Sequence, residues 1–78
     1  MSPAEHIQHQ VERLVDAELG RGEGRRLPLY DAVMAVAEKP LLEVVLRHHR
    51  GNQSHAALTL GINRNTLRKK MADYGIRA

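Results

Sequence analysis

Residues 57–75 read ALTLGINRNTLRKKMADYG, which has the spacing of two short helices joined by a turn. Ala57 is small where the two helices would cross closely, and Gly61 permits the positive φ that a tight turn needs. Leu67 follows six residues after Gly61, where it can pack the second helix back on the first, and Ile62 fills the base of the turn. The stretch therefore predicts a helix-turn-helix.

The helix after the turn, expected over residues 64–74, has two faces of different character. Leu67, Met71 and Tyr74 fall on one face at helical spacing. The opposite face is polar and basic, since four of the seven residues 64–70 are Lys or Arg. Such a face suits the major groove of DNA, where arginine pairs with guanine edges and short polar side chains hold phosphates. A purely structural helical hairpin is the alternative.

Local signals mark where these two helices begin and end. Asn52 can cap a helix over residues 53–60, and Asn63 can cap the helix that follows the turn. Gly75 is expected to end the second helix, and Gly51 to take the C-terminal glycine position of the long helix before Asn52.

A long helix is expected from about residue 28 to residue 49. Thirteen of the nineteen residues 29–47 are apolar, counting alanine and tyrosine. A helix that is apolar around most of its circumference must be covered on more than one side, and a second copy of the chain is the simplest cover. Pro40 falls inside it and should kink the axis. The alternative is two shorter helices that meet at Lys39-Pro40.

The N-terminal segment predicts one more helix. Ser2 can cap it, Pro3 suits the first helical position, and Glu5 completes a capping box. Gly20 is expected to close this helix, and the glycine- and arginine-rich residues 20–28 to form a loop. The apolar stripe of the helix consists of Ile7, Val11, Leu14, Val15 and Leu19.

Charge is distributed unevenly along the chain. Residues 1–46 hold five Lys or Arg and eight Asp or Glu, whereas residues 47–78 hold seven basic residues and one acid, Asp73. A basic end on an otherwise acidic chain suggests that nucleic acid meets only that end, with a solvated basic face as the alternative. The chain has only two aromatic residues, Tyr30 and Tyr74, which argues against single-strand binding, because that mode needs rings for base stacking.

Other function classes find little support in the composition. The chain has no cysteine, which excludes disulfides and thiolate metal sites. No apolar run approaches the ~20 residues that span a membrane, and no signal-peptide pattern is present. No nucleophile, base and acid motif or phosphate loop is present. We therefore expect a non-enzymatic protein of the cytoplasm, with no cofactor, no metal and no membrane partner.

Four stretches carry a resemblance to a known family: EKPLLEVV at residues 38–45, RGNQS at 50–54, AAL at 56–58 and GINRNTLRKK at 61–70. They closely resemble the Fis family, which are bacterial nucleoid-associated regulators that bend DNA. The resemblance is strong over residues 38–76 and weaker but compatible over residues 5–37. A similar unit closes the C-termini of enhancer-binding activators, and a free-standing relative of those domains is the alternative.

The resemblance implies an all-α homodimer of four-helix subunits located in the nucleoid. Residues 1–50 would supply intertwined dimerisation helices, and residues 51–78 the DNA-binding unit. The two recognition helices of such dimers lie closer together than one turn of straight DNA, so the DNA must bend and is read partly through its deformability. His55 stands where close family members have an arginine, and Ala72-Asp73 replaces a basic pair, so we expect a smaller bend.

The resemblance also implies roles for individual residues. Arg64 would contact a guanine in each half-site, and Asn63 would lie beside it at the base edge. Lys69 would also reach toward a base edge. The residues expected to hold phosphates or flanking DNA are Arg50, Asn52, Ser54, Thr66, Arg68, Lys69 and Lys70.

A protein-interaction adaptor is the alternative from a different functional class. In the Fis family the turn after the second helix docks other proteins, so residues 49–51 are a candidate contact for RNA polymerase. DNA binding predicts a steep loss of affinity with salt, because phosphate contacts release counterions. A pure adaptor would show no such dependence.

Overall fold

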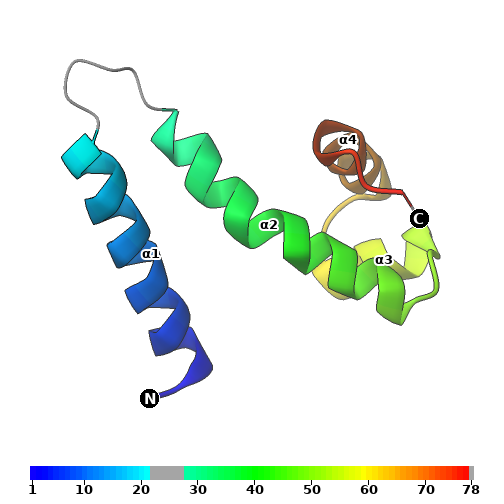
Figure 1. Ribbon diagram of the computed structural model, residues 1–78. Coiled ribbons are helices and arrows are strands. Elements are labelled where there is room, and N and C mark those ends of the chain that lie inside the picture. The colour runs from blue at the N-terminus through cyan, green and yellow to red at the C-terminus, as the bar shows by residue number, and fades with distance from the viewer. Residues whose placement is uncertain (22–27, 78) are drawn as a thin grey trace. The chain divides into compact units, whose positions relative to one another are not determined.

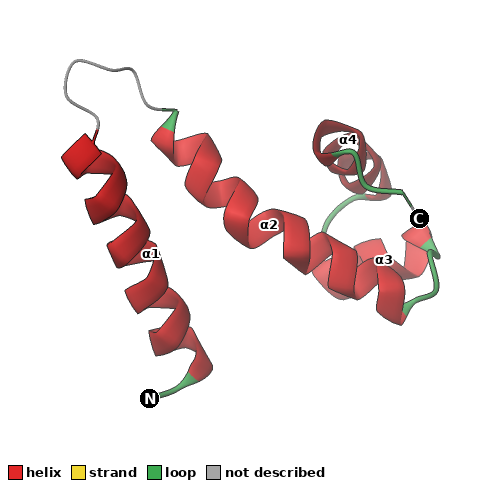
Figure 2. Cartoon of the chain, in the orientation of Figure 1, coloured by secondary structure: helices red, strands yellow, loops and turns green. Residues whose placement is uncertain are grey.

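The computed structural model describes residues 1–21 and 28–77, so most of the loop expected at residues 20–28 lies outside the described residues. Within these ranges the chain forms only helices and no strand (Figures 1 and 2). This confirms the all-α fold of four helices. The helices are α1 (Pro3–Arg21), α2 (Leu29–His48), α3 (Gln53–Leu60) and α4 (Arg64–Tyr74). No helix in the described ranges is long and apolar enough to cross a membrane.

The chain divides into two compact units, residues 1–34 and residues 35–78. The first unit begins with a capped helix, because the Ser2 hydroxyl accepts a hydrogen bond from the Glu5 N–H at 3.2 Å. The prediction that Gly20 closes α1 is wrong by one residue: the helix includes Gly20 and extends to Arg21. The side chain of Arg21 pairs with Glu18 one turn earlier, which holds the last turn together.

The second helix is continuous through Pro40, so the alternative of two shorter helices is not what the structure adopts. Proline removes the hydrogen bond to the Val36 carbonyl, and Val36 is an exposed residue. In the turns that follow, Leu42 and Leu46 are both buried in the core of the second unit. This burial keeps the helix in place despite the missing hydrogen bond.

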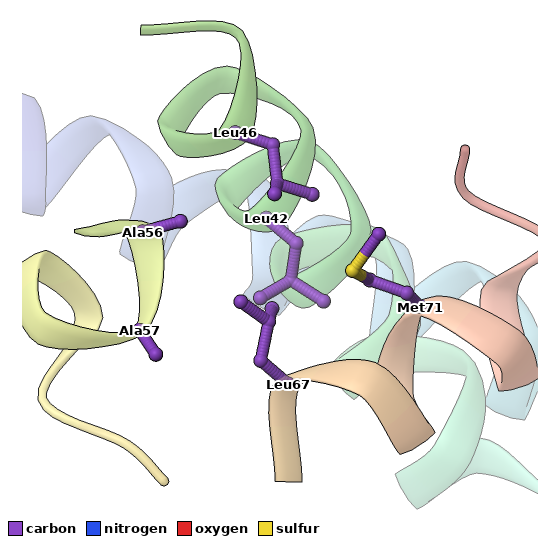
Figure 3. Close-up of a cluster of buried hydrophobic side chains, with 6 residues drawn as sticks. All are labelled: Leu42, Leu46, Ala56, Ala57, Leu67 and Met71. Atoms are coloured by element: carbon purple, nitrogen blue, oxygen red, sulfur yellow. The ribbon is translucent and has the colours of Figure 1, made fainter. Parts of the chain in front are cut away.

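The core of the second unit gathers side chains from three helices (Figure 3). Leu42 and Leu46 of α2 are buried against side chains of α3 and α4. Ala57 and Leu67 are both almost fully buried, which confirms the roles that their spacing predicted. The six buried residues are Leu42, Leu46, Ala56, Ala57, Leu67 and Met71.

The turn between α3 and α4 follows the sequence prediction. Gly61 has φ +75°, and its N–H donates to the Ala57 carbonyl at 2.9 Å. The N–H of Ile62 also donates to this carbonyl, at 3.1 Å, and the Ile62 side chain packs against the core. Glycine is required at residue 61 because side chains rarely tolerate this φ.

The end of α2 differs from the prediction that placed Gly51 at the first left-handed position. That position is occupied by Arg50, with φ +55°, and Gly51 follows with φ +82°. The N–H of Arg50 donates to the Arg47 carbonyl at 3.0 Å, and that of Gly51 donates to the Leu46 carbonyl at 2.8 Å. These two bonds form a Schellman motif, whose geometry puts the left-handed residue one position earlier than expected.

Candidate nucleic-acid interface

A polar hollow of about 380 Å³ opens between the start of α3 and α4. Four of its lining residues, Asn52, Ser54, Arg64 and Arg68, are residues that the sequence analysis predicted to contact DNA. Among the residues that the structure describes, no carboxylate lines the hollow. The complete lining is Gly51, Asn52, Gln53, Ser54, Arg64 and Arg68.

Two asparagine caps fix the backbone around this hollow. The Oδ1 atom of Asn52 accepts from the His55 N–H at 3.0 Å, and that of Asn63 accepts from the Asn65 N–H at 2.7 Å. Both predicted N-caps are therefore confirmed. Because each side-chain carbonyl is occupied in this way, only the amide NH₂ group of each asparagine is left to donate to a ligand.

The electrostatics of the hollow favour an anion. Arg64 and Arg68 line the hollow together with Gln53 and Ser54, the first two residues of α3. The backbone N–H groups at the start of α3 are not used by hydrogen bonds within the helix. These N–H groups carry the partial positive charge of a helix N-terminus. Phosphate is the anion that such a combination of arginine and helix start commonly binds.

The free face of α4 is exposed as its sequence pattern predicted. Thr66 and Lys69 are exposed, as are the two arginines of the hollow, Arg64 and Arg68, and Asn65 lies among them. In the described residues none of these basic side chains forms an ion pair. They are therefore available to a partner.

Lys70 differs from its neighbours because it turns toward α2. Its Nζ atom lies 2.9 Å from Oε2 of Glu38, while Oε1 of Glu38 accepts a hydrogen bond of 2.6 Å from the Tyr74 hydroxyl. The Tyr74 hydrogen bond, followed by that from Lys70, lowers the pKa of the Glu38 carboxyl from its ordinary value of 4.5, against the opposing effect of burial. We call these three residues the clamp.

The sequence analysis missed Glu38 and Tyr74 as residues that position α4. Glu38 is 32 residues from Lys70 and 36 from Tyr74, so no local spacing connects them. The one available signal is a carboxylate inside the apolar stretch of α2, where an unpaired charge is unfavourable.

Comparison with known proteins places this site in a family. The family model described as "Bacterial regulatory protein, Fis family" matches residues 33–74, which is more than half of the chain. The chain belongs to the Fis family. The resemblance found in the sequence is thereby confirmed.

Individual members of the Fis family match this chain over part of its length. Proteins named DNA-binding protein Fis from Escherichia coli O1:K1 / APEC, Yersinia pestis (strain Pestoides F) and Klebsiella pneumoniae subsp. pneumoniae are each 56% identical to this chain over 48 residues. The aligned region is 62% of this chain and 49% of each relative. The chain thus spans about half the length of the curated relatives it matches.

The match to the Fis family model covers the whole candidate interface. It begins inside α2 and ends at Tyr74, so it includes the clamp, the polar hollow and all nine residues predicted to contact DNA. The first helix, α1, lies outside it.

The turn after α2 holds further polar groups of this Fis-family unit. Arg50 is exposed and directly precedes Gly51, which lines the hollow. The Nε2 atom of His49 lies 2.7 Å from the Thr59 hydroxyl, a contact between this turn and α3 that the sequence analysis missed. The rings of His49 and His55 lie edge to face, with centroids 6.0 Å apart. In the described residues no group of three His, Cys, Asp or Glu side chains could hold a metal ion.

Proposed function

We propose that this protein binds and bends double-stranded DNA as a homodimer and regulates transcription in the bacterial nucleoid. The observation that carries this proposal is the polar hollow, in which Arg64 and Arg68 lie beside the N-terminus of α3 in a Fis-family helix-turn-helix. The name of the matched relatives, DNA-binding protein Fis, supports the same function. No enzymatic activity and no cofactor are part of the proposal.

Arg64 is the proposed specificity residue. It is the first residue of α4 and is exposed, as a side chain that enters the major groove must be. A bidentate pair from its guanidinium to the O6 and N7 atoms of guanine would read one base in each half-site. Asn63 would donate from its amide NH₂ group to an acceptor beside that guanine, since its Oδ1 atom is held in the cap.

The remaining residues of the site are proposed to hold the DNA backbone. Their contacts give affinity and register rather than sequence reading. Lys70 contributes less than its neighbours, because its ammonium is already paired with Glu38. The proposed backbone contacts are Arg50, Asn52, Ser54, Thr66, Arg68, Lys69 and Lys70.

The apolar side chains that one chain leaves exposed support the proposed homodimer. On α2, Val36, Leu41 and Val44 are 62%, 53% and 51% exposed, and on α1 Ile7 and Leu19 are also exposed. Exposed apolar area on this scale in a small chain is typical of an obligate partner interface. We assign dimerisation to residues 1–50 and DNA binding to residues 51–78, with bent DNA spanning the two recognition helices.

The turn at residues 49–51 is the proposed contact for RNA polymerase. It is ordered by the Schellman bonds of Arg50 and Gly51 and by the contact between His49 and Thr59. A turn that is held by these bonds and that adjoins the proposed DNA contacts is suited to contact a second protein on the same DNA.

The proposal is tested by fluorescence anisotropy with a labelled duplex of about 27 base pairs at about 50 and 200 mM salt. Wild type, Arg64→Ala and the matched control Arg13→Ala, on exposed α1, are compared. We expect wild type to bind as a dimer and to weaken steeply with salt, and Arg64→Ala to lose about 1–3 kcal/mol and its sequence preference. Arg13→Ala should bind like wild type. Absence of wild-type binding at the lower salt concentration would refute the proposed function.

A further inference from the structure

A second hollow, of about 570 Å³, lies between the C-terminal half of α2 and the residues that follow α4. Four cationic side chains line it, Lys39, Arg47, Arg50 and Arg77, together with one carboxylate, Glu43. All five are exposed, and within residues 1–21 and 28–77 none of them forms an ion pair. We call this hollow the basic cleft.

Two apolar residues that line the basic cleft, Leu46 and Ile76, are held in place by the fold. Leu46 belongs to the buried core, and Ile76 is half-buried and packs against that core. The N–H of Ile76 donates to the Met71 carbonyl at 2.8 Å, which holds the chain after α4 in place. The cleft therefore combines a cationic rim with an apolar floor.

The basic cleft and the polar hollow differ in the ligand that each can accept. The polar hollow is lined by polar and cationic residues and glycine, without a carboxylate, which suits phosphate. In the basic cleft a phosphate diester offers no hydrogen-bond donor to Glu43, and a DNA backbone offers no apolar side chain to Leu46 and Ile76. A protein segment can contact all three kinds of group in the cleft. It offers carboxylates to the arginines, backbone N–H groups to Glu43, and an apolar side chain to Leu46 and Ile76.

We propose that the basic cleft binds an acidic segment of another protein, with one apolar side chain of that segment over Leu46 and Ile76. Its carboxylates would pair with Lys39, Arg47 and Arg77. Of the proposed DNA contacts, Arg50 alone lines the basic cleft, and Gly51 lines both hollows.

The dimensions of α2 set the length of the segment. Lys39 and Arg47 are eight residues apart on the helix, a rise of about 12 Å. An extended peptide covers this distance with about four residues. A hexapeptide is therefore long enough to reach both cations and to place one apolar side chain between them.

The test uses the full chain and a fluorescein-labelled synthetic peptide of sequence EDLDEE at about 50 mM salt. The double variant Arg47→Ala with Arg77→Ala removes two cations of the cleft. The control, Arg68→Ala with Lys69→Ala, removes the same charge from the exposed face of α4. We expect wild type to bind the peptide, the cleft variant to bind about tenfold more weakly, and the control to stay within about twofold of wild type.

Two further measurements distinguish specific peptide binding in the basic cleft from nonspecific attraction between opposite charges and from DNA binding. The peptide EDSDEE, which lacks the leucine, should bind several-fold more weakly if the apolar floor is used. Anisotropy with the duplex should show loss of DNA affinity in the control variant and little change in the cleft variant. Thermal melts confirm that both variants are folded.

Four results would overturn the inference: no binding of EDLDEE to wild type, equal weakening by both double variants, equal affinity for EDSDEE, or loss of duplex affinity in the cleft variant with peptide binding retained. The last result would make the cleft a DNA surface. Peptide affinity and duplex affinity are measured separately on the same variants. Failure of the peptide inference is therefore distinguished from failure of the proposed DNA binding.

Discussion

The hydroxyl of Tyr74 donates a hydrogen bond of 2.6 Å to Oε1 of Glu38, which links the last residue of α4 to the middle of α2. The other oxygen of the same carboxylate lies 2.9 Å from the ammonium of Lys70. One carboxylate thus holds two side chains that are one turn apart on α4. Because the exposed face of α4 is the proposed recognition surface, the clamp fixes the orientation of that surface relative to the core of its unit.

Removal of the Tyr74 hydroxyl should destabilise the protein. We expect Tyr74→Phe to lower the free energy of unfolding by about 1 kcal/mol, since the ring still packs and the hydrogen bond to Glu38 is lost. Urea denaturation at fixed protein concentration measures this change. Tyr30→Phe is the matched control, because Tyr30 is 76% exposed. Equal effects of the two substitutions would mean that the hydrogen bond contributes nothing specific.

The clamp should also make the free energy of unfolding depend on pH in the acidic range. The pKa of Glu38 is lowered in the folded state, so its contribution is complete above the unfolded pKa, near 4.5, and is lost as pH falls through the lower folded pKa. We expect wild type to lose stability on acidification below about pH 4.5 more steeply than Glu38→Gln, which has no proton to gain there. Urea midpoints from about pH 6 to about pH 3 measure both curves. Parallel curves would exclude Glu38 as a source of the acid sensitivity.

Replacement of Arg50 by glycine should raise the stability of the protein and lower its affinity for DNA. Its φ of +55° is unfavourable for a residue with a side chain, so Arg50→Gly should raise the free energy of unfolding by about 0.5–1 kcal/mol. The same substitution removes a proposed phosphate contact and should weaken duplex binding. Arg50→Ala provides the comparison: it should weaken binding equally without the gain in stability. Chemical denaturation and duplex anisotropy are measured on the same samples, and unchanged stability in Arg50→Gly would contradict the strain argument.

The N-cap of α3 can be separated from its proposed DNA contact. Asn52→Ala removes the hydrogen bond to the His55 N–H and should cost about 1 kcal/mol of stability, whereas Asn52→Ser keeps a capping oxygen and should cost little. If the amide NH₂ group of Asn52 contacts phosphate, both variants should weaken duplex binding. Thermal melts and anisotropy together distinguish the two roles. A serine variant as unstable as the alanine variant would show that Asn52 acts through something other than its cap.

The sequence predicted the elements of the helix-turn-helix because their signals are local. The caps at Asn52 and Asn63 and the left-handed turn at Gly61 each depend on hydrogen bonds between residues two to five apart. The error at the end of α2 concerns a signal that is equally local but ambiguous. Two adjacent residues, Arg50 and Gly51, both adopt positive φ, and composition alone favoured the glycine as the first of them.

By itself, then, the sequence determined where α3 and α4 begin, which face of α4 is apolar, and that four basic residues lie within residues 64–70. These features follow from backbone hydrogen bonding and helical periodicity within a few residues. Only the tertiary structure decided that Lys70 pairs with Glu38. It also decided that Arg64 and Arg68 line one hollow, whereas Arg47, Arg50 and Arg77 line another. Those features depend on how α2, α3 and α4 pack around Leu42 and Leu67, which brings together side chains that are more than thirty residues apart in the chain.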